Sequence, residues 1–394
     1  MRPHIQNKYF ILITFIIVIF LIIIRAPCYF IQDGWWDIKS NSFYIYSTQN
    51  NFFKTLIFVL PSAGYFEFFT NIVAKFASYF PDYAKLIDVI FIFFLKIGIF
   101  SYIIFYNSNL ILNNKYRLIF ISLILFSTPM SPEIWMTSLH ARSYFAILTI
   151  LMIFQNFNFY SSFQLFVYRT ILIFSGLSSV YASILSPIFL LNYFFHKTKI
   201  HFTNFLISLI PLIINISLFV KFYLITNNNE ESRMVFNFSK IISFAYNIII
   251  RPFAGGTIPE IIYNKLFIKF NSDLLISFII IFVFLIFLLL KSILKRDKIF
   301  ILLLFIFLIQ CSLSLFGSLY GNFVGGRYAV LPGIAILFLL VRAQQLEKKN
   351  IFKKFYFFLI IFSITIGLLE FKFFSPLPNM LECGTKPLVR FFIE

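Results

Sequence analysis

Two carboxylates flank a pair of tryptophans in the stretch QDGWWD, where Asp33 and Asp37 enclose Trp35 and Trp36. A positioned carboxylate can serve as a general base, because it accepts the proton of an attacking hydroxyl group. The tryptophan rings could pack against an apolar face of a ligand, or they could belong to the aromatic belt of a membrane interface. The residue types therefore fit either a chemical site or a membrane anchor, and both interpretations stay open.

The same two acids could hold a divalent cation through their oxygens if both side chains point the same way. General-base chemistry does not itself require a metal, so no cofactor is predicted. The three cysteines, Cys28, Cys311 and Cys383, have neither metal-ligand spacing nor a CxxC pattern. No thiol chemistry is therefore expected.

Basic and aromatic residues gather in three later segments. STPMSPEIWMTSLHARSYF contains His140 and Arg142, YGNFVGGRYAVLPG contains Arg327 and Tyr328, and RPFAGG begins with Arg251. An arginine offers a planar fork of donors that matches the oxygens of a phosphate group. The residues predicted to bind a substrate or its phosphate are Trp35, Trp36, Glu67, His140, Arg142, Arg251, Arg327 and Tyr328.

Each of these residues also has a structural interpretation. An arginine at the outer end of a membrane helix often only anchors that helix, by extending its charge to water. His140 could be a structural hydrogen-bonding residue, and Glu67 and Glu133 could be acids that the helix dipole favours at helix N-termini. The sequence leaves these alternatives open.

The composition is that of a membrane protein. Of the 394 residues 60% are hydrophobic and only 12% are charged, and the mean hydropathy is +0.90, so the chain has too little polar surface to cover a soluble globule. The net charge of +18 does not indicate a nucleic-acid partner, because lysines and arginines clustered between apolar spans set membrane topology. We predict an all-α polytopic protein.

Eleven apolar segments of helical length recur along the chain, so we expect one transmembrane domain over residues 1–394. The first segment lacks a small-x-small cleavage site and is expected to be a retained helix. The pair around SGLSSVYASILSP could instead be a broken or re-entrant segment. The expected spans are residues 9–25, 87–106, 117–130, 143–156, 164–179, 182–196, 203–225, 273–291, 299–317, 328–342 and 354–370.

The charges predict which connections face the cytoplasm. With the N-terminus inside, sixteen lysines and arginines fall in or beside short inside connections, as the positive-inside rule requires. Of the fifteen acids only Asp297 and Glu347 then fall inside, while Asp88 and Glu370 fall within spans and the other eleven fall outside, counting Asp273 at the outer end of its span. We therefore expect the C-terminus and the polar chemistry on the outer face.

Two outer loops are large, at residues 26–86 and 226–272. In the first, GYFEFFTNIVAKFASYFPDYAK repeats apolar residues at helical spacing from Tyr65 to Phe80, with Glu67 on the opposite face. This pattern is typical of an amphipathic helix in the lipid interface. KIISFAYNIIIRPFAGGTIPEIIYNKLFIKF repeats it in two short stretches, so both loops are expected to lie on the membrane surface beside lipid headgroups.

An acidic pair soon after the first span, amphipathic juxtamembrane helices, many further spans and a late Gly-Arg-Tyr segment together resemble the GT-C fold of integral-membrane glycosyltransferases. GYFEFFTNIVAKFASYFP, PEIWMTSLHARSYFAIL and GGRYAVLPG are similar in order and type to segments of bacterial membrane proteins grouped with that superfamily. The resemblance covers most of the chain in architecture, and in sequence only these segments and QDGWWD. The chain departs from the commonest pattern, because Gly-Trp-Trp separates acids that are usually adjacent or one apart.

The resemblance implies an enzyme of the bacterial cytoplasmic membrane that transfers a sugar from a polyprenyl-phosphate carrier to a glycan, lipid or protein acceptor on the outer face. A carboxylate of the first outer loop then acts as general base, and basic side chains hold the departing lipid phosphate. By position Asp33 matches the base best, with Asp37 as partner or rival. Arg327, Arg142 and Arg251 are the residues that would stabilise the phosphate.

Two other functions fit parts of the sequence. A polymerase or ligase of lipid-linked polysaccharide also uses an arginine-rich outer loop, although such proteins usually carry their large loop late in the chain. A flippase or transporter would place ionisable groups near mid-membrane between repeated halves. Lys96, Lys221 and Asp88 are the candidates for that role, and no internal repeat accompanies them.

Overall fold

The computed structural model describes residues 8–25, 38–61, 64–105, 108–126, 137–158, 160–226, 241, 244–255, 273–317 and 326–370. Within these residues the chain is helical and contains no β-strand, apart from one isolated antiparallel bridge between Ser108 and Gln155. The prediction of an all-α architecture is therefore confirmed.

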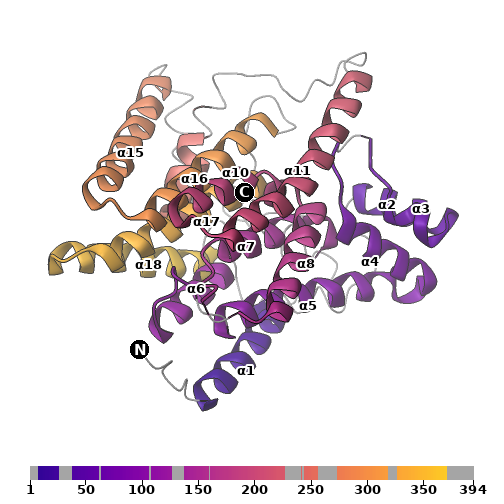
Figure 1. The fold of residues 1–394 in the computed structure, drawn as a ribbon, viewed down its shortest axis with the longest axis horizontal. Helices are drawn as coiled ribbons and strands as arrows, with labels where there is room; N and C mark the ends of the chain where they lie inside the picture. Colours follow the sequence, from indigo (N-terminus) through magenta and orange to yellow (C-terminus); the bar gives the residue numbers. More distant parts are fainter. Residues whose placement is uncertain are drawn as a thin grey trace, which may run out of the picture.

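The helices follow one another as α1 (Lys8–Arg25), α2 (Ile38–Gln49), α3 (Phe52–Leu56), α4 (Phe68–Tyr79), η2 (Pro81–Tyr83), α5 (Ala84–Phe105), α6 (Asn114–Phe126), η4 (Ser138–His140), α7 (Ala141–Ile153), α8 (Ser162–Ser178), α9 (Val180–Ser183), α10 (Ser186–His196), α11 (Lys199–Thr226), the π-helical turn η5 (Ala245–Ile250), α13 (Arg251–Ala254), α15 (Asp273–Lys295), α16 (Lys298–Gly317), α17 (Gly326–Leu346) and α18 (Asn350–Glu370). Figure 1 shows their arrangement.

Each of the eleven predicted spans overlaps a described helix, the sixth being divided between α9 and α10; residue 106 of the second span and residues 127–130 of the third lie outside the described residues. By length and composition, five described helices can cross a membrane: Pro81–Phe105, Lys199–Phe222, Lys298–Leu315, Tyr328–Leu346 and Asn350–Leu369. Four shorter apolar helices accompany them: Leu12–Ile23, Ser138–Ile153, Val180–His196 and Ile279–Lys291. The chain is thus an all-α membrane protein, while the number of eleven crossings stays a prediction.

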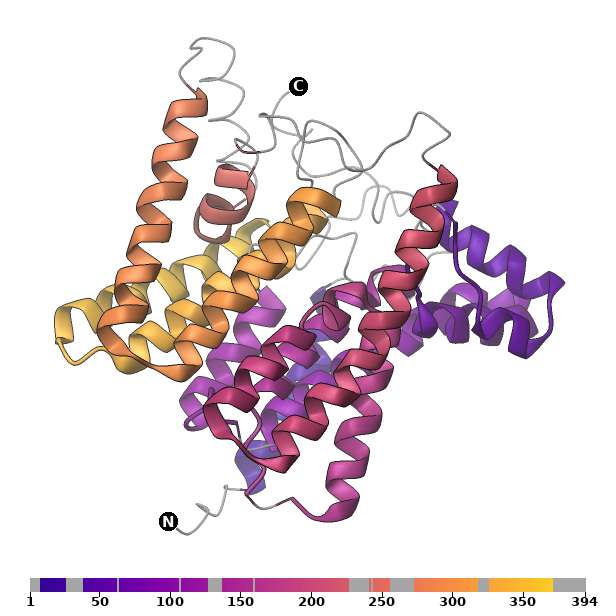
Figure 2. The same cartoon turned by 45° about the horizontal axis from the view of Figure 1, so that its top comes forward.

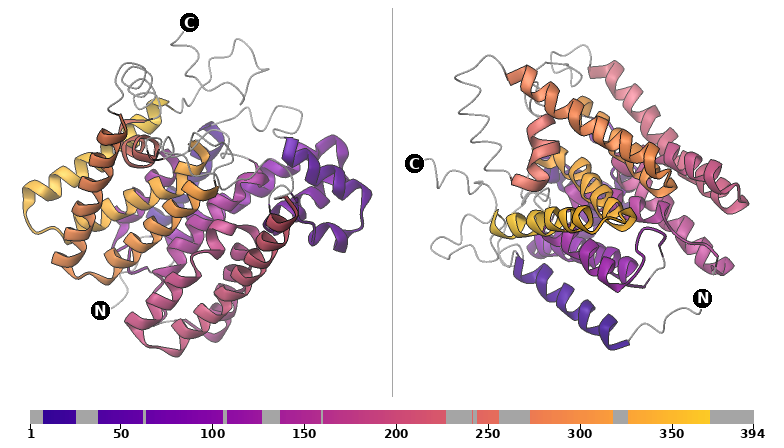
Figure 3. Two further views of the ribbon diagram at one scale, coloured as in Figure 1. Left: turned by 90° about the horizontal axis from the view of Figure 1, so that it is seen from above. Right: turned by 90° about the vertical axis from the view of Figure 1, so that its left-hand side faces the viewer.

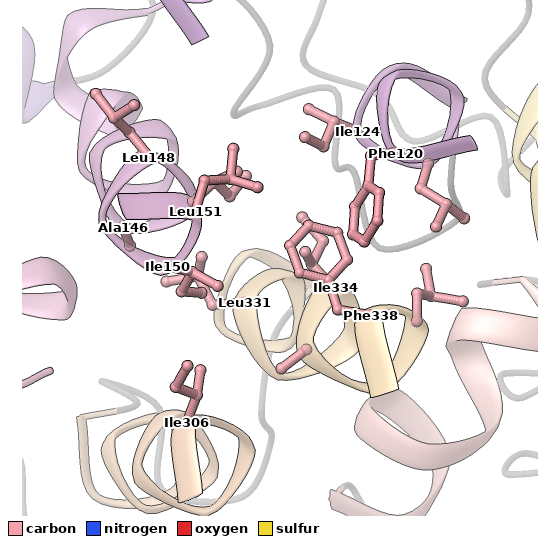
Figure 4. Packing of buried hydrophobic residues seen from close by; sticks show 14 of the residues in the cluster. Phe120, Ile124, Ala146, Leu148, Ile150, Leu151, Ile306, Leu331, Ile334 and Phe338 are labelled. Atoms are coloured by element: carbon pink, nitrogen blue, oxygen red, sulfur yellow. The ribbon is translucent and has the colours of Figure 1, made fainter. Parts of the chain in front are cut away.

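α7 and α17 form the centre of the bundle. Every residue of α17 from 328 to 344 is buried, as expected of a helix that is surrounded on all sides. Figure 4 shows its side chains packed between α6, α7 and α16. The rings of Phe120 and Phe338 meet edge to face, with their centroids 4.7 Å apart. α1, α11, α15 and α18 lie further out and expose many large apolar side chains, which suits lipid contact.

Connections that the topology places outside meet at one end of the bundle, which we call the site end. There Ser179 Oγ donates a hydrogen bond to the carbonyl of Arg142 at 2.7 Å, and Gln310 Nε2 donates to the carbonyl of Tyr181 at 3.0 Å. These bonds join the start of α7, the segment between α8 and α10, and the last third of α16. In Figure 2 the C-terminal ends of α11 and α16 lie at the upper side.

Connections predicted to be inside meet at the opposite end, which we call the basic end. Arg342, near the end of α17, binds Asp297 with Nε and Nη2 at 2.9 and 2.7 Å. Gln345 donates to the carbonyl of Leu110, before α6. The turn between α15 and α16 lies at the lower side in Figure 2. The described connections that were predicted inside therefore lie together at one end, while the number of crossings and the orientation stay predictions.

α4 is helical as predicted, but its polar face does not lie toward water or lipid headgroups. Lys75 Nζ donates to the carbonyls of Ser47 and Asn50 at 2.9 and 2.8 Å. Asn71 Nδ2 donates to the carbonyls of Leu56, at the end of α3, and of Phe58, just after it. α2 and α3 cover this face, because their backbone carbonyls supply the partners that buried donors require. The prediction of a surface helix with a free polar face is corrected: α2, α3 and α4 form a layer at the side of the bundle away from α15 and α18 (Figure 3).

The second large loop also departs from its prediction over the described part. Residues 244–249 are all buried, and η5 packs against α15 and α17 while α13 packs against α17 and α18. The apolar residues of this stretch are therefore covered by protein, and the prediction of a surface position is wrong for them. Residues 227–240, 242–243 and 256–272 of that loop lie outside the described residues.

The chain leaves the helix within SGLSSVYASILSP, the segment that could form either two spans or one broken segment. Ser179 has extended backbone angles (φ −154°, ψ 118°) between α8 and α9, and its hydroxyl caps α9 by accepting from the amide of Ala182. Asn215 of α11 supports the break, since its Nδ2 donates to the carbonyl of Gly176 and to Ser183 Oγ, both at 3.2 Å. Irregular backbone inside a membrane bundle is tolerated only where protein or a polar cavity supplies such partners.

The close approach of α8 and α11 gives a testable prediction. A Cβ added to Gly176 would lie 2.4 Å from Cγ of Pro211, so Gly176→Ala must push two backbones apart, at a cost of about 1–3 kcal/mol. Gly98→Ala is the matched control, because its Cβ would meet nothing within 4 Å. We expect Gly176→Ala to lower the thermal unfolding midpoint in detergent and Gly98→Ala to leave it unchanged or raise it slightly; equal midpoints would contradict the packing of α8 on α11.

Candidate functional site

A buried ion pair joins α4 to α7 at the site end. Arg142 Nη1 lies 3.2 Å from Glu67 Oε1, and the exposed fractions of the two side chains are 12% and 3%. Glu67 occupies the N-cap position of α4, but its side chain makes no capping hydrogen bond. Glu67 therefore lies at a helix N-terminus, as its interpretation as an acid favoured by the helix dipole expects, and its side chain in addition pairs with Arg142.

Tyrosines surround the guanidinium group. Arg142 Nη1 donates a hydrogen bond to the hydroxyl of Tyr65, and Cζ of Arg142 lies 5.6 Å from the centre of the Tyr65 ring and 6.0 Å from that of Tyr181. Tyr328 is close enough to interact electrostatically with Tyr65. Burial raises the pKa of Tyr65 well above its usual range, although the charge of Arg142 opposes the rise, so its phenol stays protonated at neutral pH.

Arg142 is positioned by the turn that precedes α7. Asp88 of α5 accepts a hydrogen bond from the amide of Ser138 at 3.0 Å, and Thr70 of α4 donates to the carbonyl of Ser138, also at 3.0 Å. These bonds attach η4 to both neighbouring helices. Because α7 starts directly after η4, they fix where Arg142 emerges beside Glu67.

Tyr328 and the Tyr65 segment are held in a similar way. Ser314 Oγ of α16 donates to the carbonyl of Tyr328 at 2.7 Å, and Asn215 Oδ1 of α11 accepts from the amide of Phe66 at 2.9 Å. Asn215 is the same residue that supports the break between α8 and α9. Four separate parts of the sequence thus converge on one cluster, which consists of Tyr65, Glu67, Arg142, Tyr181 and Tyr328.

Several buried oxygens beside this cluster have no hydrogen-bond partner among the described residues. They are Thr137 Oγ1, Ser175 Oγ, Ser178 Oγ and Gln310 Oε1. Thr137 precedes η4, Ser175 and Ser178 belong to the last turn of α8, and Gln310 holds the carbonyl of Tyr181. Buried polar groups normally have a hydrogen-bond partner in the protein or in ordered water, so these four oxygens keep hydrogen-bonding capacity that the described residues do not use.

The structure brings together three residues that the sequence singled out, Glu67, Arg142 and Tyr328. His140 is buried in η4, two residues before Arg142. Arg251 begins α13, which packs against α17 and α18. Arg327 is the second residue of α17, directly before Tyr328, and its side chain lies outside the described part of the structure. Asp33, Trp35, Trp36, Asp37 and Glu133 also lie outside the described residues.

Two site residues were missed. Tyr65 fell among the apolar positions of the α4 pattern, and Tyr181 lay in the segment recognised only as an interrupted span. A usable signal was available for Tyr181: an irregular stretch rich in serine within an apolar run indicates backbone that must find polar partners. Tyr65 carried no comparable signal, because a tyrosine at an apolar helical position usually contributes only its ring to packing.

The ionisable residues considered for a transporter have other surroundings. Asp88 supports η4 at the site end, and Lys221 is exposed. Lys96 is buried, with Nζ 4.9 Å from the centre of the Tyr144 ring. Within the described residues, no three His, Cys, Asp or Glu side chains gather as metal ligands; the pair Asp33 and Asp37 is not among those residues.

No protein-family model, curated protein sequence or solved structure matches this chain. The resemblance to GT-C glycosyltransferases therefore stays a prediction from the sequence.

The buried pair predicts strong thermodynamic coupling between Glu67 and Arg142. Glu67→Gln leaves the guanidinium without its counter-charge and is expected to cost on the order of 3 kcal/mol of unfolding free energy. Arg142→Gln should cost a similar amount, and the double variant should lose clearly less than the sum. Unfolding in mixed micelles measures all three.

Asp82→Asn is the control for this double-mutant cycle, because Asp82 is exposed in the short helix before α5. It should change the unfolding free energy by less than about 0.5 kcal/mol. Strict additivity of the two single changes would show that the charges do not interact.

Proposed function

We propose that this protein is an integral-membrane glycosyltransferase of the GT-C type. It takes a sugar from a polyprenyl-phosphate donor and transfers it to a glycan, lipid or protein acceptor on the outer face of the bacterial cytoplasmic membrane. The observation that carries the proposal is the Arg142 guanidinium, held by Glu67 and Tyr65 at the site end. In the chain, the segment with Asp33 and Asp37 directly precedes α2, and Arg327 directly precedes Tyr328.

A guanidinium in this setting suits a phosphate group. The side chain of Arg142 is 12% exposed and largely surrounded by protein, and in such low-dielectric surroundings its attraction for an anion is stronger than in water. Glu67 and Tyr65 hold Nη1, which orients the planar group before a ligand arrives. Preorganised donors of this kind stabilise the charge that develops on a leaving phosphate.

In the reaction we propose, the carboxylates of QDGWWD act on the acceptor hydroxyl group, and the arginines act on the carrier phosphate. A hydroxyl oxygen of the acceptor attacks C1 of the sugar, while the C1–O bond to the carrier phosphate breaks and its electron pair goes to the phosphate. Asp33 or Asp37 accepts the hydroxyl proton. Arg142 and Arg327 stabilise the polyprenyl phosphate that leaves, and the partnerless oxygens of Ser175, Ser178 and Gln310 contact the sugar hydroxyls.

The orientation follows from charge. The basic end carries Lys291, Lys295, Arg296, Arg342 and Lys348 with only two acids in its connections. The positive-inside rule places such an end in the cytoplasm. The site end then faces outward, where polyprenyl-linked sugars are consumed according to the GT-C resemblance.

An assay with a panel of polyprenyl-phosphate sugars tests the activity. We expect the purified protein, reconstituted in liposomes, to transfer radiolabel from at least one polyprenyl-phosphate sugar, and Asp33→Asn or Asp37→Asn to abolish that transfer without affecting membrane insertion. Asp82→Asn is the matched control. Undiminished transfer by both Asp33→Asn and Asp37→Asn would remove the assignment of a carboxylate base in QDGWWD.

Arg142→Lys separates charge from geometry at the cluster. Lysine keeps the positive charge but cannot offer a planar fork, so we expect transfer to fall by about 100-fold. Arg169→Lys on α8 is the control, since Arg169 bonds to Asn204 by Nε at 3.3 Å, outside the cluster. Unchanged transfer by Arg142→Lys would exclude Arg142 from phosphate binding.

A further inference from the structure

Asp88 is a buried acid that the proposed reaction does not use. It lies in the second turn of α5 and is 2% exposed, within a helix that is long and apolar enough to cross a membrane. An ionisable side chain inside a membrane bundle is costly, and where one is kept it commonly serves a function. Its contact indicates which: Oδ1 of Asp88 accepts a hydrogen bond from the backbone amide of Ser138 at 3.0 Å.

Ser138 begins η4 and is held from two sides. α5 supplies the carboxylate of Asp88 to its amide, and α4 supplies Thr70, whose Oγ1 donates to the carbonyl of Ser138 at 3.0 Å. The next residue, Leu139, packs into the layer of α2 and α4. A hydrogen bond to a carboxylate is stronger than one between neutral groups, so the bond from Asp88 contributes strongly to fixing this turn.

Two bonds join α4 to the segment formed by η4 and the start of α7. Glu67 and Thr70 are three residues apart at the start of α4 and therefore share one of its faces. Glu67 pairs with Arg142, and Thr70 binds Ser138, four residues earlier. The backbone from Ser138 to Arg142 is helical throughout, so a displacement of Ser138 also moves Arg142 relative to Glu67.

We propose that Asp88 is a positioning residue for Arg142. Its carboxylate holds Ser138 and, through the helical backbone, keeps the guanidinium beside Glu67 in the orientation that receives the carrier phosphate. This inference rests on the proposed function of Arg142. Orientation matters there, because a displacement on the order of 1 Å in a reacting site can cost about 100-fold in rate.

Transfer of radiolabel by the reconstituted full chain, measured in two backgrounds, tests the proposal. In the chain that keeps Arg142, we expect Asp88→Leu to lower transfer by about tenfold or more, and Asp88→Asn to lower it less, because the amide oxygen still accepts from Ser138. In the Arg142→Lys background neither change should lower transfer further, since the group that Asp88 positions is gone. Unchanged transfer in the first background, or the same fold-loss in both, would overturn the proposal.

Tyr168→Phe is the matched control. It removes one buried hydrogen bond at the other end of α7, from the Tyr168 hydroxyl to the carbonyl of Met152 at 3.0 Å. Transfer should change by the same factor in both backgrounds, whatever the effect on stability. The comparison also tests the simpler alternative that Asp88 only stabilises the N-terminal end of η4 and α7 by its charge, because such a role would give Asp88→Leu the pattern of the control.

A second cycle, of thermal unfolding midpoints in mixed micelles, does not depend on the reaction. Asp88→Leu and Arg142→Gln together should shift the midpoint by clearly less than the sum of their single shifts, because both remove supports of one segment. If Asp88→Leu does not fold, Asp88→Asn replaces it in both cycles. Additive shifts would refute the coupling. If the wild-type chain transferred no sugar while this coupling was present, the proposed function would fail and the positioning of Arg142 by Asp88 would stand.

Discussion

The ion pair of Arg142 and Glu67 is the interaction around which the site end is organised. A charge enclosed in an apolar bundle needs an opposite charge and hydrogen-bond partners, because its transfer from water costs several kcal/mol, on the order of 5 or more for an isolated ion. The start of α7, the start of α4, the break after α8 and the start of α17 each supply part of that environment. The polar residues of these four segments therefore depend on one another.

This dependence explains why polar helices cover α4. Its polar face contains Asn71 and Lys75, and its first residues bring Glu67 to Arg142. If α4 lay free on the membrane surface, Glu67 would lose its fixed orientation. α2 and α3 hold the helix by accepting from the polar face through backbone carbonyls, which adds no competing charge near the pair.

Apolar periodicity predicted the helices well, since the spans depend on local composition that one chain displays directly. It predicted the site less well. Glu67, Arg142 and Tyr328 were named from their residue types, but their meeting depends on how α4, α7 and α17 pack, and helical spacing does not specify which element covers a face. Lys75 illustrates the difficulty: a lysine on the polar side of an amphipathic pattern has the same signature whether it meets water or the carbonyls of α2. The acids of QDGWWD stay a prediction, because they lie outside the described residues.

Asn215 gives the site end a mechanical property. One side chain in the middle of α11 accepts from the amide of Phe66 and donates to Gly176 and Ser183. α11 cannot slide along its axis without breaking these bonds or carrying the neighbouring Tyr65 and the α8–α9 break with it. Since α11 is otherwise mostly exposed on its outer surface, it acts as a strut that ties the segment of Tyr65 to the segment of Tyr181, the two tyrosines whose rings lie near the Arg142 guanidinium.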